Sequence, residues 1–469
     1  MLPTTLFNIE HSILTTEDGG AEIDAEKAFK QVVAVVDGVL EYSTTLKGDI
    51  THIASCSFWH SLMGADEKGR PTTKVLTWAD TRSRKYTDVL RKRFDETAVH
   101  NRTGARFHSS FWPAKLLWLK GGDPSRSEGA ASTAKWLSFI DYVNLKLSDN
   151  ATTSVSMASG TGIFDIRKCA WDDELLRYLK VKTSSLPEIA STDDETFALS
   201  QKWKKRWPRL ADAKWCPAIA DGAANNVGSG CTERSQAALM IGTSGAMRVA
   251  YKGEPPNEIP SGLFCYGIDR ERVVLGGALS DGGGLYAWLK KTLRTDLSDD
   301  DIGKEMSRRG ADAHGLTFMP FFAGERSTGY NENAFGSITG LNASHDAIDI
   351  LQAAMESVAY RFAAIFDQLK RVAKIDEIVA SGGAVENSPV WTQMLADVLG
   401  RDLTVSNEPE ASMRGAVLLA LESLGKIEII EGKTTSTALT KFHPKCREIY
   451  KKARKRHAKY YEQISKINQ

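Results

Sequence analysis

Residues 375–391 read Ile-Asp-Glu-Ile-Val-Ala-Ser-Gly-Gly-Ala-Val-Glu-Asn-Ser-Pro-Val-Trp, and they contain the clearest structural unit of the chain. The apolar start predicts a buried strand. Ser388 followed by Pro389 predicts a helix, because serine caps helices and proline is favoured in their first turn. A second strand is expected over 403–406 and a second helix from about 411 to 424. Strand, glycine turn, helix, strand and helix in this order predict a mostly parallel sheet in an α/β protein.

The composition is typical of a folded globular protein and argues against several functions. The chain has 469 residues, enough for two or three domains, with 42% hydrophobic residues, 25% charged residues and a net charge of +1. So small a charge argues against nucleic-acid binding through a global positive field. The longest apolar run, 416–421, is too short to span a membrane, and the N-terminus lacks the features of a signal peptide. Six scattered cysteines favour reduced thiols, so we expect a cytoplasmic protein without nucleic-acid or membrane partners.

Other segments complete the expected organisation. In chain order, we expect a helix capped by Asp24, a strand over 50–56, a hairpin joining 61–66 to 74–78, a long helix capped by Ser344, and a basic helix over 445–466 with a solvated charged face. Residues 252–260 are rich in proline and glycine, which predicts a domain boundary nearby. We therefore divide the chain into a first domain, 1–250, and a second domain, 251–469.

Asp221 is the first candidate for chemistry. It follows the apolar strand expected over 216–220 and precedes Gly222. A carboxylate at the carboxyl end of a buried strand points into the crevice where α/β sheets bind ligands. There it can accept the proton of a hydroxyl group that attacks phosphorus. A helix N-cap is the alternative interpretation, because the residues that follow can form a helix.

Three glycine clusters would let a phosphate or a nucleotide approach the backbone. Gly242-Thr243-Ser244 ends an apolar strand and offers backbone N–H groups and two hydroxyls to an anion, although a hairpin turn explains it as well. It is not a Walker A loop, because no Gly-Lys-Ser/Thr follows. Residues 381–384 lie between a strand and a helix, where a nucleotide ring can rest on bare backbone, with a plain turn as the alternative. Helix packing explains the glycines at 282–284 equally well.

An aromatic and charged set precedes these clusters in the sequence. Trp59 and His60 follow the strand expected over 50–56, and Trp78, Asp80 and Arg82 come shortly after. Indole faces cover the C–H patches of sugars, while Asp and Arg side chains hydrogen-bond hydroxyls or a carboxylate. A site for a polar ligand is one interpretation. The alternative is two core tryptophans with a surface pair of Asp80 and Arg82.

Taken in order, these stretches resemble the FGGY family of ATP-dependent sugar kinases, and the resemblance is collinear from about residue 15 to the C-terminus. The motifs that carry it are Trp78-Ala-Asp-Thr-Arg82, Ala158-Ser-Gly-Thr-Gly-Ile-Phe-Asp165, Asp221-Gly, Gly242-Thr-Ser, Gly324-Glu-Arg326, Ser381-Gly-Gly-Ala-Val-Glu-Asn-Ser-Pro-Val-Trp391 and Glu410-Ala-Ser-Met-Arg-Gly415. The resemblance implies an α/β fold of two actin-like, ribonuclease H-like domains with a cleft between them.

The resemblance also implies a role for each candidate residue. Asp221 matches the general base that takes the proton from the sugar hydroxyl. The phosphate-binding loop matches Gly242, Thr243 and Ser244, and the adenosine site matches Gly382, Gly383, Ala384 and Asn387. Contacts with the sugar fall at Trp59, His60, Trp78, Asp80 and Arg82. ATP with Mg²⁺ is the implied donor, because phosphoryl transfer needs neutralised charge on the phosphate oxygens. No metal ligand is assigned.

Residues 57–66 and 76–82 most resemble the gluconate kinase branch of the family. The implied reaction is phosphorylation of gluconate to 6-phosphogluconate, and Arg82 is the candidate partner of the gluconate carboxylate. A kinase for another polyol or ketose, such as xylulose or glycerol, is the alternative within this class. The implied partner is a small sugar or sugar acid, and homodimer formation is left open.

One element of the family is absent from this sequence. The family's N-terminal half opens with a β-hairpin that carries an Asp-x-Gly-Thr loop for phosphate and Mg²⁺, whereas this chain begins roughly at the third strand. Without the hairpin, the strand over 50–56 and the segment 6–14 would keep unpaired edges. We therefore expect an N-terminally incomplete kinase, and a catalytically inactive kinase-like binding protein is the alternative from a different class.

Overall fold

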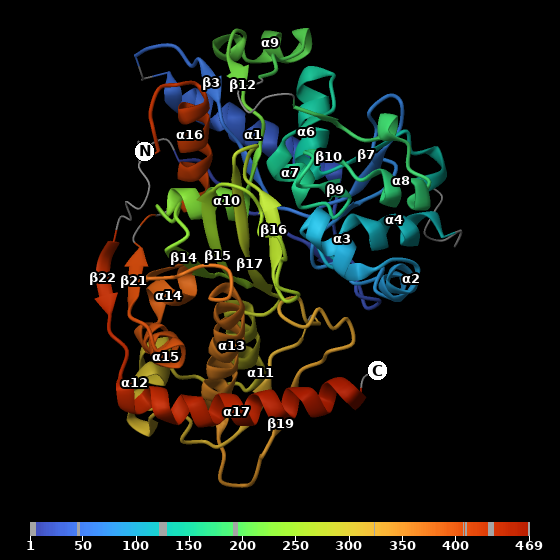
Figure 1. The fold of residues 1–469 in the computed structure, drawn as a ribbon. Helices are drawn as coiled ribbons and strands as arrows, with labels where there is room; N and C mark the ends of the chain where they lie inside the picture. The colour runs from blue at the N-terminus through green and yellow to red at the C-terminus, as the bar shows by residue number, and fades with distance from the viewer. Residues whose placement is uncertain are drawn as a thin grey trace.

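Two α/β domains make up the computed structural model, which describes residues 6–44, 47–121, 129–190, 196–322, 324–406, 408, 410–429 and 436–467. In Figure 1 the first domain, in blue and green, lies above most of the second domain, in yellow, orange and red. Short strands and many helices form the first domain, and one large sheet forms the second. The prediction of a two-domain α/β protein is therefore confirmed.

A seven-stranded sheet forms the centre of the second domain. Its strands lie in the order β16 (Phe264–Gly267), β17 (Arg272–Leu279), β15 (Gly245–Lys252), β14 (Gln236–Ile241), β20 (Glu377–Ser381), β21 (Leu403–Ser406) and β22 (Ser436–Thr440). β14, β20 and β21 are parallel, and the other pairs are antiparallel. The two strands expected around the glycine turn are β20 and β21, so their parallel pairing was correctly predicted.

Helices complete the second domain. They are α11 (Gly283–Thr292), α12 (Asp299–Arg309), α13 (Ala347–Leu369), α14 (Gly383–Asn387), α15 (Pro389–Leu399), α16 (Ala411–Ser423) and α17 (Pro444–Ile467), with a small hairpin of β18 (Thr317–Met319) and β19 (Ser337–Thr339). α15 begins as predicted, because the Ser388 hydroxyl accepts the N–H of Trp391. It ends at Gly400, whose φ of 61° suits glycine.

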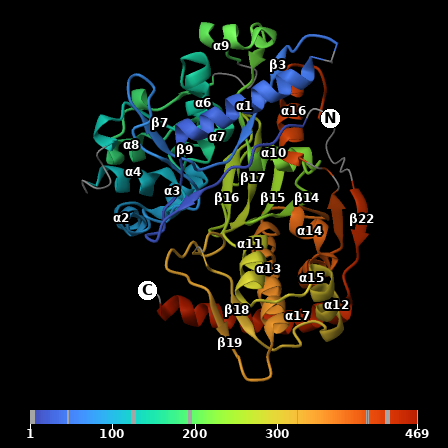
Figure 2. The same cartoon turned by 180° about the vertical axis from the view of Figure 1, so that it is seen from behind.

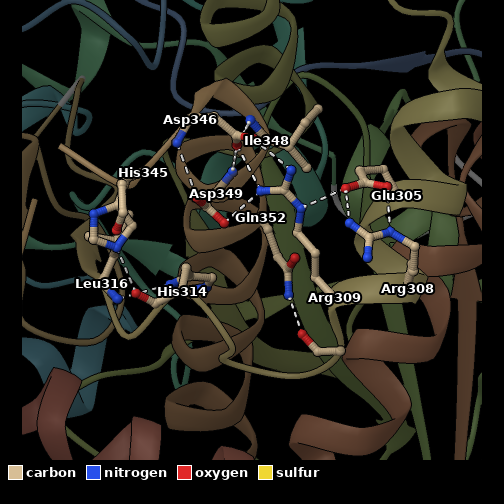
Figure 3. Close-up of polar contacts among 12 residues, drawn as sticks. Glu305, Arg308, Arg309, His314, Leu316, His345, Asp346, Ile348, Asp349 and Gln352 are labelled. Carbon is tan, nitrogen blue, oxygen red and sulfur yellow. Dashed lines mark hydrogen bonds and ion pairs between the residues drawn. The ribbon is translucent and has the colours of Figure 1, made fainter. Parts of the chain in front are cut away.

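The long helix α13 starts two residues later than predicted. Its N-cap is Asp346, whose carboxylate accepts the N–H groups of Ile348 and Asp349, while the Asp349 carboxylate accepts the N–H of Asp346. Arg309 at the end of α12 pairs with both carboxylates, at 2.6 and 2.7 Å (Figure 3). A carboxylate gains from the helix N-terminus and from this cation together, which the Ser344 hydroxyl cannot. The prediction of Ser344 as N-cap is wrong for this reason.

The basic helix predicted near the C-terminus is α17, and it runs along the lower part of the second domain in Figures 1 and 2. Tyr450 points inward and is buried. Part of the basic face is paired rather than solvated. Arg454 lies 2.6 Å from Asp367, and Arg456 lies 2.5 Å from Asp312.

The first domain consists of short elements. Its strands are β1 (Leu14–Thr15), β2 (Ala21–Ile23), β3 (His52–Ile53), β4 (Cys56–Ser57), β5 (Met63–Ala65), β6 (Val75–Leu76), β7 (Lys135–Leu137), β8 (Thr152–Thr153), β9 (Phe164–Asp165), β10 (Ala170–Trp171), β11 (Glu188–Ile189), β12 (Lys214–Trp215) and β13 (Ile219–Ala220). Its α-helices are α1 (Ala25–Ser43), α2 (Lys85–Arg93), α3 (Glu96–Thr103), α4 (Trp112–Lys120), α6 (Phe139–Ser148), α7 (Val155–Ser159), α8 (Asp173–Leu179), α9 (Gln201–Arg206) and α10 (Asp221–Gly228).

Two local predictions for the first domain are confirmed. Asp24 caps α1, because its carboxylate accepts the N–H of Lys27 at 3.0 Å. The hairpin that joins 61–66 to 74–78 is also present. Leu62 and Leu76 exchange two backbone hydrogen bonds across it, at 3.0 and 2.8 Å.

The single strand expected over 50–56 is instead two short strands. β3 pairs in parallel with β12, and β4 pairs in parallel with β13. Over the parts of the chain that the structure describes, neither has a second partner strand. Residues 6–13 form no strand and lie along α1, where the Phe7 ring contacts Gly38. Figure 2 shows α1 across the near face of the first domain. The absence of an initial hairpin from the fold stays a prediction.

The two domains meet where α10 and α16 cross. A Cβ on Gly228 would lie 1.8 Å from the carbonyl oxygen of Ala411, and one on Gly415 would lie 1.8 Å from that of Ala224. No side chain fits at either position, so the two backbones touch. This contact holds α10 next to the second domain. Asp221, the first residue of α10, therefore lies at the edge of that domain.

The sheet pairing also bears on the domain boundary. β14 and β15 pair with each other and with β20 and β17 inside the seven-stranded sheet. We therefore propose that the boundary lies between α10 and β14 rather than near residue 250.

Across the described segments, no helix combines the length and the apolar character needed to cross a bilayer.

Gly415→Ala tests the helix crossing. The added methyl group must displace the Ala224 carbonyl, so we expect the free energy of unfolding, measured in urea, to fall by about 2 kcal/mol or more. Gly303→Ala is the matched control, because its Cβ would meet Val390 at an ordinary 3.5 Å. This control should keep its stability or gain up to about 1 kcal/mol, since alanine is the better helix former. Wild-type stability of Gly415→Ala would contradict so close a crossing.

Candidate active site

A small cavity of about 100 Å³ lies between the two domains. Its lining residues are Phe58, Trp59, His60, Trp78, Asp221, Met240, Ser244, Gly245, Ala246, Arg248, Phe264, Tyr266, Ala278 and Arg326. Three residues of the predicted sugar site, Trp59, His60 and Trp78, therefore come together with Asp221, the candidate base. Two arginines that the sequence did not single out for the sugar site, Arg248 and Arg326, join them.

His60 is fixed as a neutral side chain in this cavity. Its backbone has φ of 68°, uncommon for a residue other than glycine. Its Nδ1 lies 2.5 Å from the carbonyl oxygen of Gly160, and its Nε2 lies 3.2 Å from Nη2 of Arg326. Because the carbonyl can only accept, Nδ1 donates its hydrogen and Nε2 accepts one from Arg326. Burial, with Arg326 as a further cause, holds the pKa of His60 well below its ordinary value, which agrees with this neutral form.

The backbone around His60 is held by one buried lysine. Nζ of Lys115, on α4, donates to the carbonyl oxygens of His60, Thr77 and Ser110, at 2.8, 2.7 and 2.8 Å. Three separate segments of the cavity wall are thereby joined at one ammonium group. Burial lowers the pKa of Lys115 to about 7, and Asp80 opposes the change. The sequence signal for this role was a lone lysine inside an apolar helix.

Asp221 is the first residue of α10 and not its N-cap, which is Ala220. The alternative interpretation of Asp221 as a capping residue is therefore wrong, and among the described residues its carboxylate accepts the N–H of the adjacent Gly222, at 2.7 Å. Asp221 is exposed to solvent. The protein around it nevertheless raises its pKa through desolvation, and Arg248 opposes the rise. A carboxylate with a raised pKa is a stronger proton acceptor.

Asp80 and Arg82 do not line the small cavity. Nη2 of Arg82 lies 2.5 Å from Asp80 and 2.7 Å from Glu22, and its guanidinium lies over the Trp118 ring. Asp80 also accepts the N–H of Ala21 at 3.1 Å. The two residues thus join β2 to the loop after β6. With two carboxylates already on it, Arg82 is not placed to bind the carboxylate of a sugar acid in this structure.

A second cavity, of about 440 Å³, lies in the second domain. Its lining residues are Gly242, Thr243, Gly283, Gly284, Tyr286, Ala287, Asp299, Ile302, Gly303, Met306, Met355, Gly383, Ala384, Asn387, Ser388, Val390 and Trp391. Five residues predicted to bind nucleotide are among them: Gly242, Thr243, Gly383, Ala384 and Asn387. Apolar and aromatic walls next to bare glycine backbone suit a planar base with attached phosphates.

The remaining two predicted nucleotide residues lie elsewhere. Gly382 does not line the cavity but packs against the backbone of Ile241. Its φ is 96°, and a Cβ there would lie 2.6 Å from the Ile241 carbonyl oxygen. Ser244 faces the small cavity instead. The glycines at 282–284, which helix packing explained equally well, take part in the second cavity. The N–H groups of Gly283 and Gly284 donate to the backbone of the 242–243 turn.

The turn at 242–245 separates the two cavities. Gly242 and Thr243 line the larger one, and Ser244 and Gly245 line the smaller one. A Cβ on Gly242 would meet nothing closer than Met240 Sδ at 3.7 Å, so the turn is open to an approaching group. The two cavities are therefore neighbours that share this turn as a wall.

The side-chain clusters that could hold a metal ion do not line either cavity. Among the described residues, two groups of side chains are close enough together to hold a metal ion: Asp397 with His443 and Cys446, and Asp312 with His314 and Glu356. Neither group lines either cavity. The second group is fully engaged in the fold, because Glu356 accepts hydrogen bonds from surrounding side chains and Arg456 pairs with Asp312.

The small cavity thus lies at the junction of two α/β domains, and the larger cavity lies in the second domain. Residues 7–214 match the N-terminal domain of the FGGY family of carbohydrate kinases, and residues 237–424 match its C-terminal domain. The chain belongs to the FGGY family of carbohydrate kinases. The resemblance inferred from the sequence motifs, and the fold class that it implied, are confirmed.

The relatives of this chain are named for different substrates. A gluconokinase of Bacillus subtilis is 26% identical over 450 residues, which cover 93% of this chain and 86% of the relative. A xylulose kinase of Staphylococcus xylosus is 26% identical over 416 residues, covering 88% and 85%. The crystal structure of gluconate kinase from Lactobacillus acidophilus superposes with a TM-score of 0.84 at 26% identity, covering 97% of this chain and 92% of that one.

Lys115→Met tests the buried lysine. Removing it leaves three buried carbonyl groups without a donor, so we expect the free energy of unfolding at pH 7 to fall by about 3 kcal/mol. Unfolded lysine keeps its proton up to about pH 10.5, whereas folded Lys115 loses it near pH 7. Between these values the unfolded chain binds more protons, so the Lys115 contribution to stability rises with pH.

The measurement is urea unfolding of both proteins from pH 7 to pH 10. The stability difference between wild type and Lys115→Met should widen as the pH increases. Lys146→Met is the matched control, because Lys146 is partly exposed and its 3.4 Å contact with Glu26 is weak. A difference that stays constant over this range would contradict a lowered pKa of Lys115.

Proposed function

We propose that this protein transfers the γ-phosphoryl group of ATP to a hydroxyl of a sugar or sugar acid, with gluconate as substrate and 6-phosphogluconate as product. One observation carries the proposal: the 242–245 turn lines both cavities, and Asp221 faces the smaller one. A nucleotide held in the larger cavity would direct its phosphates toward this turn. A hydroxyl in the smaller cavity would then lie between the turn and the carboxylate.

In the proposed mechanism, Asp221 accepts the proton of the attacking hydroxyl as the bond to phosphorus forms. The indoles of Trp59 and Trp78 bound the substrate on its apolar faces. His60, as a neutral acceptor, orients Arg326 in the cavity. The bare backbone at Gly242 admits the phosphates without steric hindrance.

Mg²⁺ would neutralise charge on the phosphate oxygens during transfer. The larger cavity has one carboxylate, Asp299, but it already bonds the Tyr286 hydroxyl and Lys290. The cavity residues therefore fit a nucleotide better than a dedicated metal site. We propose that the ion binds together with the nucleotide, and we assign no protein ligand to it.

The proposal of gluconate is supported by the names of relatives and by the charge of the small cavity. A gluconokinase and a gluconate kinase structure are both 26% identical to this chain, as is a xylulose kinase. The cavity has two arginines and one carboxylate, which suits an acidic sugar. Xylulose or glycerol is the alternative substrate. A cytoplasmic location is also proposed, and a homodimer stays a prediction.

ADP release by the purified chain tests the proposed function, with gluconate, xylulose, glycerol and no sugar as the four conditions. We expect release that depends on gluconate, and Asp221→Asn should lower kcat by about 100- to 10,000-fold, the usual contribution of a general base. Asp212→Asn is the matched control, because Asp212 is exposed and outside both cavities.

Different outcomes separate the alternatives. Turnover with xylulose or glycerol but not with gluconate would contradict gluconate as the substrate. It would still support the proposed kinase activity. Full activity of Asp221→Asn would contradict the assignment of Asp221 as the general base. Nucleotide binding without turnover on any of these sugars would favour the catalytically inactive, kinase-like binding protein.

A further inference from the structure

We propose that Arg248, with Arg326 beside it, forms an anion subsite that binds the carboxylate of an acidic sugar in the small cavity. The inference rests on the proposed function and assigns the specificity of the same site. Arg248 thereby takes the role that the sequence suggested for Arg82.

Arg248 is buried without the partners that a buried arginine normally has. It lies on β15 and is only 8% exposed. Its Nε and Nη1 have no hydrogen-bond partner among the described residues. A buried cation with unused donors is costly, and the cost is offset when an anion supplies acceptors. Burial lowers the pKa of Arg248 to about 10, and the nearby Asp221 carboxylate opposes this change.

The location of Arg248 points to a ligand of the small cavity. A Cβ added to Gly222 would lie 3.0 Å from Cζ and from Nη2 of Arg248, so the guanidinium packs directly against the start of α10. It is therefore close to Asp221, the proposed base. Arg248 lines the small cavity and does not line the nucleotide cavity.

The charges of the cavity favour an anionic ligand. Its ionised side chains are Asp221, Arg248 and Arg326, and His60 is held neutral by its two contacts. Two cations against one carboxylate leave one positive charge uncompensated. A guanidinium binds a carboxylate through charge-assisted hydrogen bonds, and Arg248 has unused donors at Nε and Nη1.

This arrangement predicts discrimination against neutral sugars. When a neutral polyol displaces water from the cavity, the donors of Arg248 stay buried and unpaired. A site built around a specific polar group rejects analogues that lack it far more strongly than an apolar pocket rejects a missing methylene group. Gluconate and glucitol form a matched pair, because they differ only in having a carboxylate or a CH₂OH group at one end.

The role of Arg248 has one competing assignment, which is stabilisation of the phosphoryl group during transfer. The two roles differ in what a substitution changes. Loss of a carboxylate contact raises KM for the acid and leaves neutral substrates unaffected. Loss of a phosphoryl contact lowers kcat equally for all substrates.

Arg248→Met, which removes the charge and keeps the length, tests the subsite together with the conservative Arg248→Lys. Binding of gluconate and of glucitol is measured by calorimetry without nucleotide, and kcat and KM by ADP release. We expect Arg248→Met to weaken gluconate binding and raise its KM by about 10- to 100-fold, with glucitol unchanged within about threefold. Arg248→Lys should recover part of the loss. Arg308→Met is the matched control, because Arg308 is 72% exposed and bonds only Glu305 on its own helix.

Each outcome decides the proposal. Unchanged gluconate affinity in Arg248→Met, or wild-type affinity for glucitol equal to that for gluconate, would overturn it. An equal loss of kcat for both sugars, with KM unchanged, would assign Arg248 to the phosphoryl group. Arg248-dependent gluconate binding without turnover would keep the subsite while the proposed kinase activity fails. If Arg248→Met does not fold, as judged by circular dichroism, the Arg248→Lys measurements decide alone, with a gluconate affinity equal to that of wild type as the overturning result.

Discussion

The architecture depends on one close contact between two helices of different domains. α10 and α16 cross at Gly228 and Gly415, where any side chain would collide with the opposite backbone. Because α10 begins at Asp221, the crossing sets where this carboxylate lies relative to the second domain. The hydroxyl of Ser412, on α16, donates to the backbone oxygen of Asp221 at 3.2 Å and fixes the same end of α10. The proposed mechanism needs Asp221 and the 242–245 turn on one small cavity, and both line it.

Buried basic side chains organise the substrate side of the small cavity. Lys115 holds three wall segments through their carbonyl groups, and one of these segments carries His60 in a left-handed backbone conformation. His60 in turn accepts from Arg326 across the domain junction. The wall of the cavity is therefore preorganised by hydrogen bonds that are protected from water, which makes them costly to break.

The two arginines considered for the sugar site show why a motif can mislead about charge. Arg82 belongs to a stretch that resembles a sugar-binding motif, but Glu22, sixty residues earlier, neutralises it together with Asp80. Arg248 lies in an otherwise apolar strand, which gives no sign of a binding role. An arginine is available to a ligand only when the fold leaves its donors unused, and such availability depends on residues distant in sequence.

By itself, the sequence determined the local elements and the glycine-lined turns. β20, α15, β21 and the cap of α1 follow from apolar runs, capping residues and glycines that act within a few residues, and the motif order placed the chain in its family. The tertiary structure alone decided that Asp346 rather than Ser344 caps α13, that Thr243 and Ser244 face different cavities, and that Arg248 rather than Arg82 keeps free donors. The physical reason is that burial and charge pairing are set by residues brought together from distant parts of the chain, whereas backbone preference is set by neighbours.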